Sequence, residues 1–284
     1  TLPGTNIASG SAIIIDTTAP TVISFTSTTA DGSYKSAGTV NITATVSETI
    51  VSGNTITVTL DTSDNVTLTA AANGTTLVGT YTVSSGDTSS DLNVSSFSIG
   101  TVTDSAGNAM TSTAVPATNI ATGSAIVIDN TVPTIISFTS TTADGSYKST
   151  GTVNITATAS EAVVSGNTIT VILDTGDSIL LTAAANGTTL VGTYTVSSAD
   201  TSSDLTVNSF SIGTVTDSAG NAMTSTAVPA TNIATGSAIV IDNTVPTIIS
   251  FTSTTADGSY KSTGTVNITA TASEAVVSGN TITV

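Results

Sequence analysis

The sequence contains no cysteine, histidine, tryptophan or arginine, and its only basic residues are Lys35, Lys148 and Lys261. Without cysteine the chain can form neither a disulfide nor a thiolate metal site. Without histidine or cysteine the familiar nucleophile–base pairs of enzymes lack their base, so we expect no enzymatic activity. Three basic residues against nineteen acidic ones give a net charge of −16, which disfavours nucleic acid and anionic membrane surfaces as partners.

Long apolar runs are also missing. None approaches the ~18 residues that a membrane-spanning helix needs, so we expect no membrane insertion in this segment. Serine and threonine instead make up 106 of the 284 residues, and this richness with so little lysine suits an extracellular, cell-surface protein. Disorder is disfavoured, because only 8% of the residues are charged and the mean hydropathy is positive, at +0.37.

A repeat of 113 residues organises the chain. The sequence Asp-Gly-Ser-Tyr-Lys-Ser begins at Asp31 and recurs at Asp144 and at Asp257. Residues 17–129 and 130–242 differ at only 15 of 113 positions. A fixed period of this kind predicts a tandem array of similar units.

The two ends match the two parts of a repeat. Residues 1–16 resemble 114–129, the end of a repeat, and residues 243–284 resemble the opening of one. We therefore predict the C-terminal strand of a preceding repeat over 1–16, complete repeats over 17–129 and 130–242, and the N-terminal part of a further repeat over 243–284. The chain is then either a segment of a longer array or a protomer that neighbouring chains complete strand by strand.

Each complete repeat shows the period-2 alternation of β-strands and no helical period. Apolar residues occupy every second position from Val40 to Val46, and Asn73-Gly74 is a strong hairpin signal. We predict strands at 21–28, 40–46, 56–60, 66–72, 77–83, 94–102 and 125–128. Seven short strands are typical of an immunoglobulin-like sandwich. The predicted fold is therefore all-β, with seven-stranded Ig-like β-sandwiches joined end to end in a rod.

Acidic residues recur at the predicted joints. If successive strands alternate in direction, the loops after the second and sixth strands meet the linker that enters the repeat. These segments carry the candidate metal ligands Asp16, Glu48, Asp104, Asn108, Asp129, Glu161, Asp217, Asn221, Asp242 and Glu274. A second candidate set lies at the opposite end of each repeat and faces the next joint: Asp31, Asp87, Asp144 and Asp200.

Converging carboxylates favour a bound cation. Two like charges ~4 Å apart cost about 4 kcal/mol at an effective dielectric constant near 20. Calcium accepts carboxylate, amide and carbonyl oxygens, whereas zinc and copper are poorly served without histidine or cysteine. The alternative is that these are ordinary solvated turn residues, because aspartate and asparagine populate turns for backbone reasons.

Four short motifs follow one another in each repeat. In the first they are Asp16/Thr18/Pro20, Asp31/Gly32/Tyr34, Ser47/Glu48 and Asp104/Ala106/Gly107/Asn108. This order resembles the bacterial Ig-like (cadherin-like) tandem repeats of giant cell-surface adhesins and extracellular filaments, over the whole chain. The resemblance implies a long extracellular stalk, often stiffened by calcium at the joints between domains. It also implies a ligand role for Asp129, Glu161, Asp217 and Asn221.

From these observations we expect a structural repeat segment of an extracellular adhesin stalk or surface filament, rigidified by calcium at its joints. Its partners would be the neighbouring repeats and, in a filament, other copies of the chain. One alternative is an Ig-like module that binds carbohydrate or protein, although the lack of tryptophan argues against a sugar site. Another is a self-assembling filament or surface-layer subunit completed by strand exchange.

Overall fold

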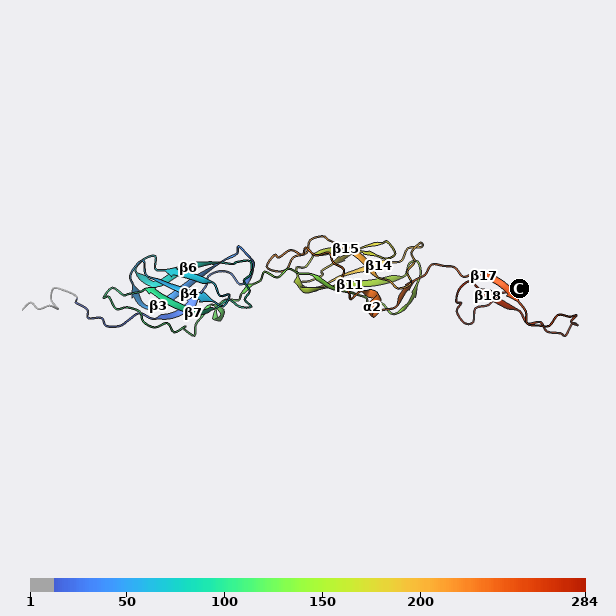
Figure 1. Ribbon diagram of the computed structural model, residues 1–284, viewed down its shortest axis with the longest axis horizontal. Coiled ribbons are helices and arrows are strands. Elements are labelled where there is room, and N and C mark those ends of the chain that lie inside the picture. The colour runs from blue at the N-terminus through green and yellow to red at the C-terminus, as the bar shows by residue number, and fades with distance from the viewer. Residues whose placement is uncertain (1–12) are drawn as a thin grey trace, which may run out of the picture.

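The computed structural model describes residues 13–284, in which almost all of the regular secondary structure is β-strand (Figure 1). The prediction of an all-β chain is confirmed. One hydrophobic core lies within residues 22–128 and a second within residues 135–241. Figure 1 shows these two parts one after the other along the long axis, followed by the strands of the C-terminal segment. Residues 17–129 are called the first unit below, 130–242 the second unit and 243–284 the third segment.

The two units contain the same strands in the same order. The first unit contains β1 (Val22–Thr26), β2 (Gly32–Tyr34), β3 (Thr39–Ile50), β4 (Thr55–Leu60), β5 (Asn65–Thr69), β6 (Gly74–Thr82), β7 (Val94–Thr101) and β8 (Ile126–Ile128). The second contains β9 (Ile135–Thr139), β10 (Gly145–Tyr147), β11 (Thr152–Val163), β12 (Thr168–Leu173), β13 (Ser178–Thr182), β14 (Gly187–Thr195), β15 (Val207–Ile212) and β16 (Ile239–Ile241). Each of the seven predicted strands therefore overlaps an observed one.

Two local features were not predicted. The three-residue strands β2 and β10 run parallel to β8 and β16, and they are too short to show a period. A helical turn also precedes β8 and β16: a 3-10 turn at Ile120–Thr122 and the one-turn helix α2 at Ile233–Gly236. Asn119 and Asn232 cap these turns through their side chains, which is a preference that asparagine owes to its short acceptor group.

Each unit folds one six-stranded sheet back on itself. The order is β1-β3-β6-β5-β4-β7 in the first unit, and β5 and β6 pair at only one position, Thr69 with Val78. The outermost strands β1 and β7 nevertheless bring Phe25 and Phe97 together, with ring centroids 5.6 Å apart in an edge-to-face arrangement. The sheet therefore closes over a core into which the alternate residues of β3, β4 and β5 point.

Glycine is required where the fold passes from β5 to β6 and from β13 to β14. A Cβ atom on Gly192 would lie 2.5 Å from the carbonyl oxygen of Leu180 and 2.6 Å from the side chain of Leu181. Gly79 occupies the same position in the first unit, with Thr67 and Leu68 as its neighbours. Any larger residue would force the two strands apart.

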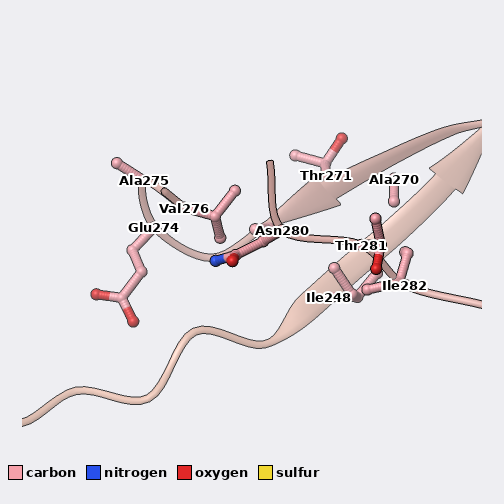
Figure 2. Close-up of a pocket in the computed structure, with 10 residues that line it drawn as sticks. Ile248, Ala270, Thr271, Glu274, Ala275, Val276, Asn280, Thr281 and Ile282 are labelled. Carbon is pink, nitrogen blue, oxygen red and sulfur yellow. The ribbon is translucent and has the colours of Figure 1, made fainter. Parts of the chain in front are cut away.

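The third segment contains two strands, β17 (Ile248–Thr252) and β18 (Thr269–Ala272), which pair in the register of β9 and β11. Figure 2 shows Ile248 and Ile282 beside each other in a groove along these strands. Their equivalents one repeat earlier, Ile135 and Ile169, are buried in the second core. The third segment thus presents one half of such a core. Among residues 13–284, no helix has the length and apolar character needed to cross a bilayer.

Candidate metal centre

Three carboxylates meet where the linker enters each unit. At the entry to the second unit they belong to Asp129, which directly follows β8 of the first unit, to Glu161 of β11 and to Asp217 of the turn after β15. One oxygen atom from each side chain lies within 4.8 Å of the others. Asp16, Glu48 and Asp104 form the same group at the first unit. The predicted convergence of linker and loops therefore occurs in both complete units.

A break in strand pairing directs the glutamate toward its group. The pairing of β11 with β14 shifts register between Thr158 and Val163, and Glu161 lies within the irregular stretch. The preceding Ser160 is held by the start of the neighbouring strand: its N–H donates to the Thr134 carbonyl at 2.8 Å, and its Oγ accepts from the Thr134 N–H at 3.0 Å. An irregularity of this kind changes the direction of a side chain. Ser160 is therefore bonded to the neighbouring strand, while the side chain of Glu161 turns toward the acidic group.

The turn Asp217–Asn221 holds the second carboxylate rigidly. Asp217 is only 3% exposed. Its Oδ1 accepts from the Asn221 N–H at 2.8 Å and its Oδ2 accepts from the Asn221 side-chain amide at 2.7 Å. Gly220 completes the turn with φ at +85°, a conformation that favours glycine. The Asp-Ser-Ala-Gly-Asn turn thus holds the carboxylate of Asp217 in place through its own hydrogen bonds.

The linker that carries the third carboxylate is attached on both sides. The Asp129 N–H donates to the Tyr34 carbonyl of the first unit at 2.9 Å, and its own carbonyl accepts from the Asn221 side chain of the second unit at 2.9 Å. Next to it, the Asn130 side chain accepts from the Ser36 N–H at 2.7 Å and donates to the carbonyl of Asp87 at 2.9 Å. The carboxylate group therefore lies at a hydrogen-bonded junction between two units.

The electrostatics of the group are unfavourable without a cation. Burial, and then the negative charges of Asp129 and Asp217, raise the pKa of Glu161 above its usual value. Burial and the charges of Asp16 and Asp104 do the same to the pKa of Glu48. In contrast, the hydrogen bond from the Asn108 side chain is the main cause that lowers the pKa of Asp104. The group at the first unit thus combines an aspartate held ionised with a glutamate whose ionisation is opposed.

Each glutamate also contributes an oxygen that lacks a partner. Oε1 of Glu48 and Oε1 of Glu161 are buried and, in the part of the chain that the structure describes, accept no hydrogen bond. Buried oxygens are normally paired, and an unpaired one beside two further carboxylates is suited to a metal–oxygen bond. The donor set consists of oxygen atoms alone, which fits calcium better than zinc or copper.

The remaining candidates of the first set are placed differently. Asn108 and Asn221 lie at their groups as predicted, but their side-chain amides donate to Asp104 and Asp217 and to the linker carbonyls. This arrangement makes them supports for the carboxylates. In the third segment, Oε1 of Glu274 is again buried and unpartnered within the described residues. Asp242, the last residue of the second unit, accepts from the Thr244 N–H at 2.9 Å. The position one repeat after Asp217, which would supply the third carboxylate, lies beyond residue 284.

The second candidate set does not join these groups. The two groups found among residues 13–284 contain none of Asp31, Asp87, Asp144 and Asp200. Asp31 and Asp144 accept hydrogen bonds from the N–H groups of Ala125 and Ala238, both at 2.9 Å. Asp87 and Asp200 accept from Tyr81 and Tyr194, both at 2.6 Å, as well as from a nearby backbone N–H. These four aspartates therefore accept hydrogen bonds from groups of their own unit, whereas the sequence analysis predicted that they face the next joint.

Several residues that shape the joint were missed by the sequence analysis. Asn130 has a counterpart in Asn243, whose side chain makes the same bonds to Ser149, Ser197 and Asp200. The sequence did contain a signal for these two asparagines, because an asparagine directly follows the linker aspartate at both positions. Lys35 is a further residue of this kind, because its ammonium group donates to the carbonyl of Gly220 in the second unit.

The chain matches no model of a protein family and no curated protein.

Proposed function

We propose that this chain is a structural segment of an extracellular stalk or filament, built from tandem Ig-like sandwiches and stiffened by calcium at the joints. The observation that carries the proposal is the group of Asp129, Glu161 and Asp217, with oxygens within 4.8 Å of one another at the junction of two units. Like charges held at this distance repel, and a shared hard cation converts the repulsion into attachment.

The residues around the group support a mechanical role. One ligand comes from the linker and two from the unit that follows, so a cation that binds all three ties the linker to that unit. The linker is already bonded to the unit before it through the Tyr34 carbonyl and the Asn130 side chain. Binding would therefore restrict bending at the joint without any movement inside either core.

The residues also fit the chemistry of calcium. Asp129 accepts a hydrogen bond at one carboxylate oxygen and Asp217 accepts one at each of its two oxygens, and Glu161 offers a buried oxygen without a partner. Calcium accepts six to eight oxygen ligands, so carbonyl groups or water would complete the shell. In this arrangement the protein orients three carboxylates and the ion neutralises them.

The proposal is tested by small-angle scattering of the full chain, in chelator and in calcium. We expect the chelated chain to show a shorter and broader distribution of interatomic distances, because its joints bend. Glu161→Gln should remove most of the calcium effect, whereas Glu274→Gln, whose group lacks its third carboxylate, should retain it. Identical scattering in chelator and calcium would overturn the proposal.

A further inference from the structure

Each repeat contributes a single lysine, and the first of them crosses the joint. Lys35 directly follows β2 and belongs to the first unit, yet its Nζ donates to the carbonyl of Gly220 in the second unit at 2.6 Å. Beside it, the hydroxyl groups of Ser33 and Ser218 are hydrogen-bonded at 3.2 Å. Both contacts fall on the turn Asp217–Asn221, the same turn that mounts one carboxylate of the acidic group.

The two surfaces are held in shape before they meet. On the first unit, β2 is paired with β8, and the Lys35 carbonyl accepts from the Gly38 N–H at 2.9 Å. On the second unit, the Asp217 side chain and the Asn221 amide fix the turn internally. Gly220 also packs closely, since a Cβ atom at this position would lie 3.5 Å from the Lys35 ammonium. Preformed surfaces lose little conformational entropy when they associate.

We infer that Ser33 and Lys35 form a docking surface for the Asp217–Asn221 turn of the next repeat. This contact restrains the joint when no ion is bound, and a bound ion would restrain it further. It also supplies a positive charge beside a turn that carries a carboxylate of the acidic group. If the acidic group binds calcium as proposed above, docking of the lysine and binding of the ion stabilise the same turn, and each therefore favours the other.

The chain contains its own controls. Lys148 lies one repeat after Lys35, but the turn that it would contact falls beyond residue 284. Conversely, the turn Asp104–Asn108 of the first unit, which corresponds to Asp217–Asn221, has no lysine in this chain to contact it, because Lys35 is the first lysine of the sequence. A substitution at Lys148 therefore matches one at Lys35 in its local surroundings but removes no contact with this turn.

The test measures the joint directly in chelator. Because the chain has no cysteine, Thr76→Cys and Thr189→Cys place single spin labels on equivalent exposed positions of β6 and β14. Electron–electron resonance then reports the distance between the two units. Lys35→Met should lower the docked population by up to about fivefold, the range expected for an exposed charged contact, and broaden the distance distribution. Lys148→Met should leave the distribution unchanged. A distribution unaffected by Lys35→Met, or broadened equally by both substitutions, would overturn the inference.

A second arm separates this inference from the proposed function. In a calcium titration, Lys35→Met should weaken binding at the group of Asp129, Glu161 and Asp217 and leave the group of Asp16, Glu48 and Asp104 unaffected. An absence of calcium binding in the parent chain would refute the proposed function, while the result in chelator would still decide the docking contact. Equal weakening at both groups would refute the coupling between docking and ion binding.

Discussion

Replacing Glu161 with glutamine should change the stability of the second unit in opposite directions with and without calcium. At 4.8 Å and an effective dielectric constant of 20, one like-charge pair costs about 3.5 kcal/mol. Glu161 faces two such charges, but it is partly exposed and the solution contains salt, so we expect a net gain of ~1–2 kcal/mol in chelator. With calcium present, the variant has lost a ligand. An ion at about a hundred times its dissociation constant contributes about 2.7 kcal/mol, and much of this contribution should disappear.

Hydrogen exchange followed by mass spectrometry can measure this effect unit by unit. Peptides from β3 and β11 differ in sequence at three positions, for example Val46 against Ala159, so the two units are distinguishable. The β11 peptide of Glu161→Gln should exchange more slowly than the parent in chelator and faster than the parent in calcium. The β3 peptide of the same variant is the internal control and should not change. A shift of the same sign under both conditions would refute the reasoning, because it would show that Glu161 acts as an ordinary surface or packing residue.

Three further predictions concern the units themselves. Gly192→Ala should destabilise the second unit by about 1–3 kcal/mol in urea, because the new methyl group meets the Leu180 carbonyl; Gly187→Ala, with open space around it, should be nearly neutral, and equal losses would contradict this. Tyr194→Phe should cost about 1.5–3 kcal/mol in the same assay, because it removes the 2.6 Å hydrogen bond to the Asp200 carboxylate; an unchanged midpoint would show that water replaces the hydroxyl. In chelator, stability should rise as the pH falls from 7 through the raised pKa of the two cluster glutamates, since the folded state then holds protons that the unfolded chain releases. It should fall again once Asp200, whose pKa is lowered by hydrogen bonds that outweigh its burial, becomes protonated. A steady decline from pH 7 downward would contradict the assignment.

The strands could be predicted from the sequence because alternation and turn chemistry agree. Val40 to Val46 alternate with polar residues, and each apolar member is buried in the structure. The short strand β2 could not be predicted, since Gly32–Tyr34 is too brief for a period and is fixed only by its pairing with β8. The closure of the sheet could likewise not be predicted from the sequence, because it depends on the single pair Thr69–Val78 and on the close approach of Gly79 to β5.

The meeting of the acidic residues could also be predicted in part from the pattern of strands. Alternating strand directions place Glu161 and Asp217 at the end that the linker enters, and this inference needs no side-chain detail. Sequence alone did not reveal that Asn221 donates to the carboxylate, because its amide offers both a donor and an acceptor. It also did not show that Asp87 is held by Tyr81, a contact that depends on how the strand and its following loop pack.

Calcium binding to the full chain tests the central claim most directly. Equilibrium dialysis should find two ions per chain, one for each three-carboxylate group among residues 13–284. Glu48→Gln and Glu161→Gln should each remove one ion, and the double variant should remove both. The absence of bound calcium in the parent chain, or a stoichiometry that neither substitution changes, would contradict the account.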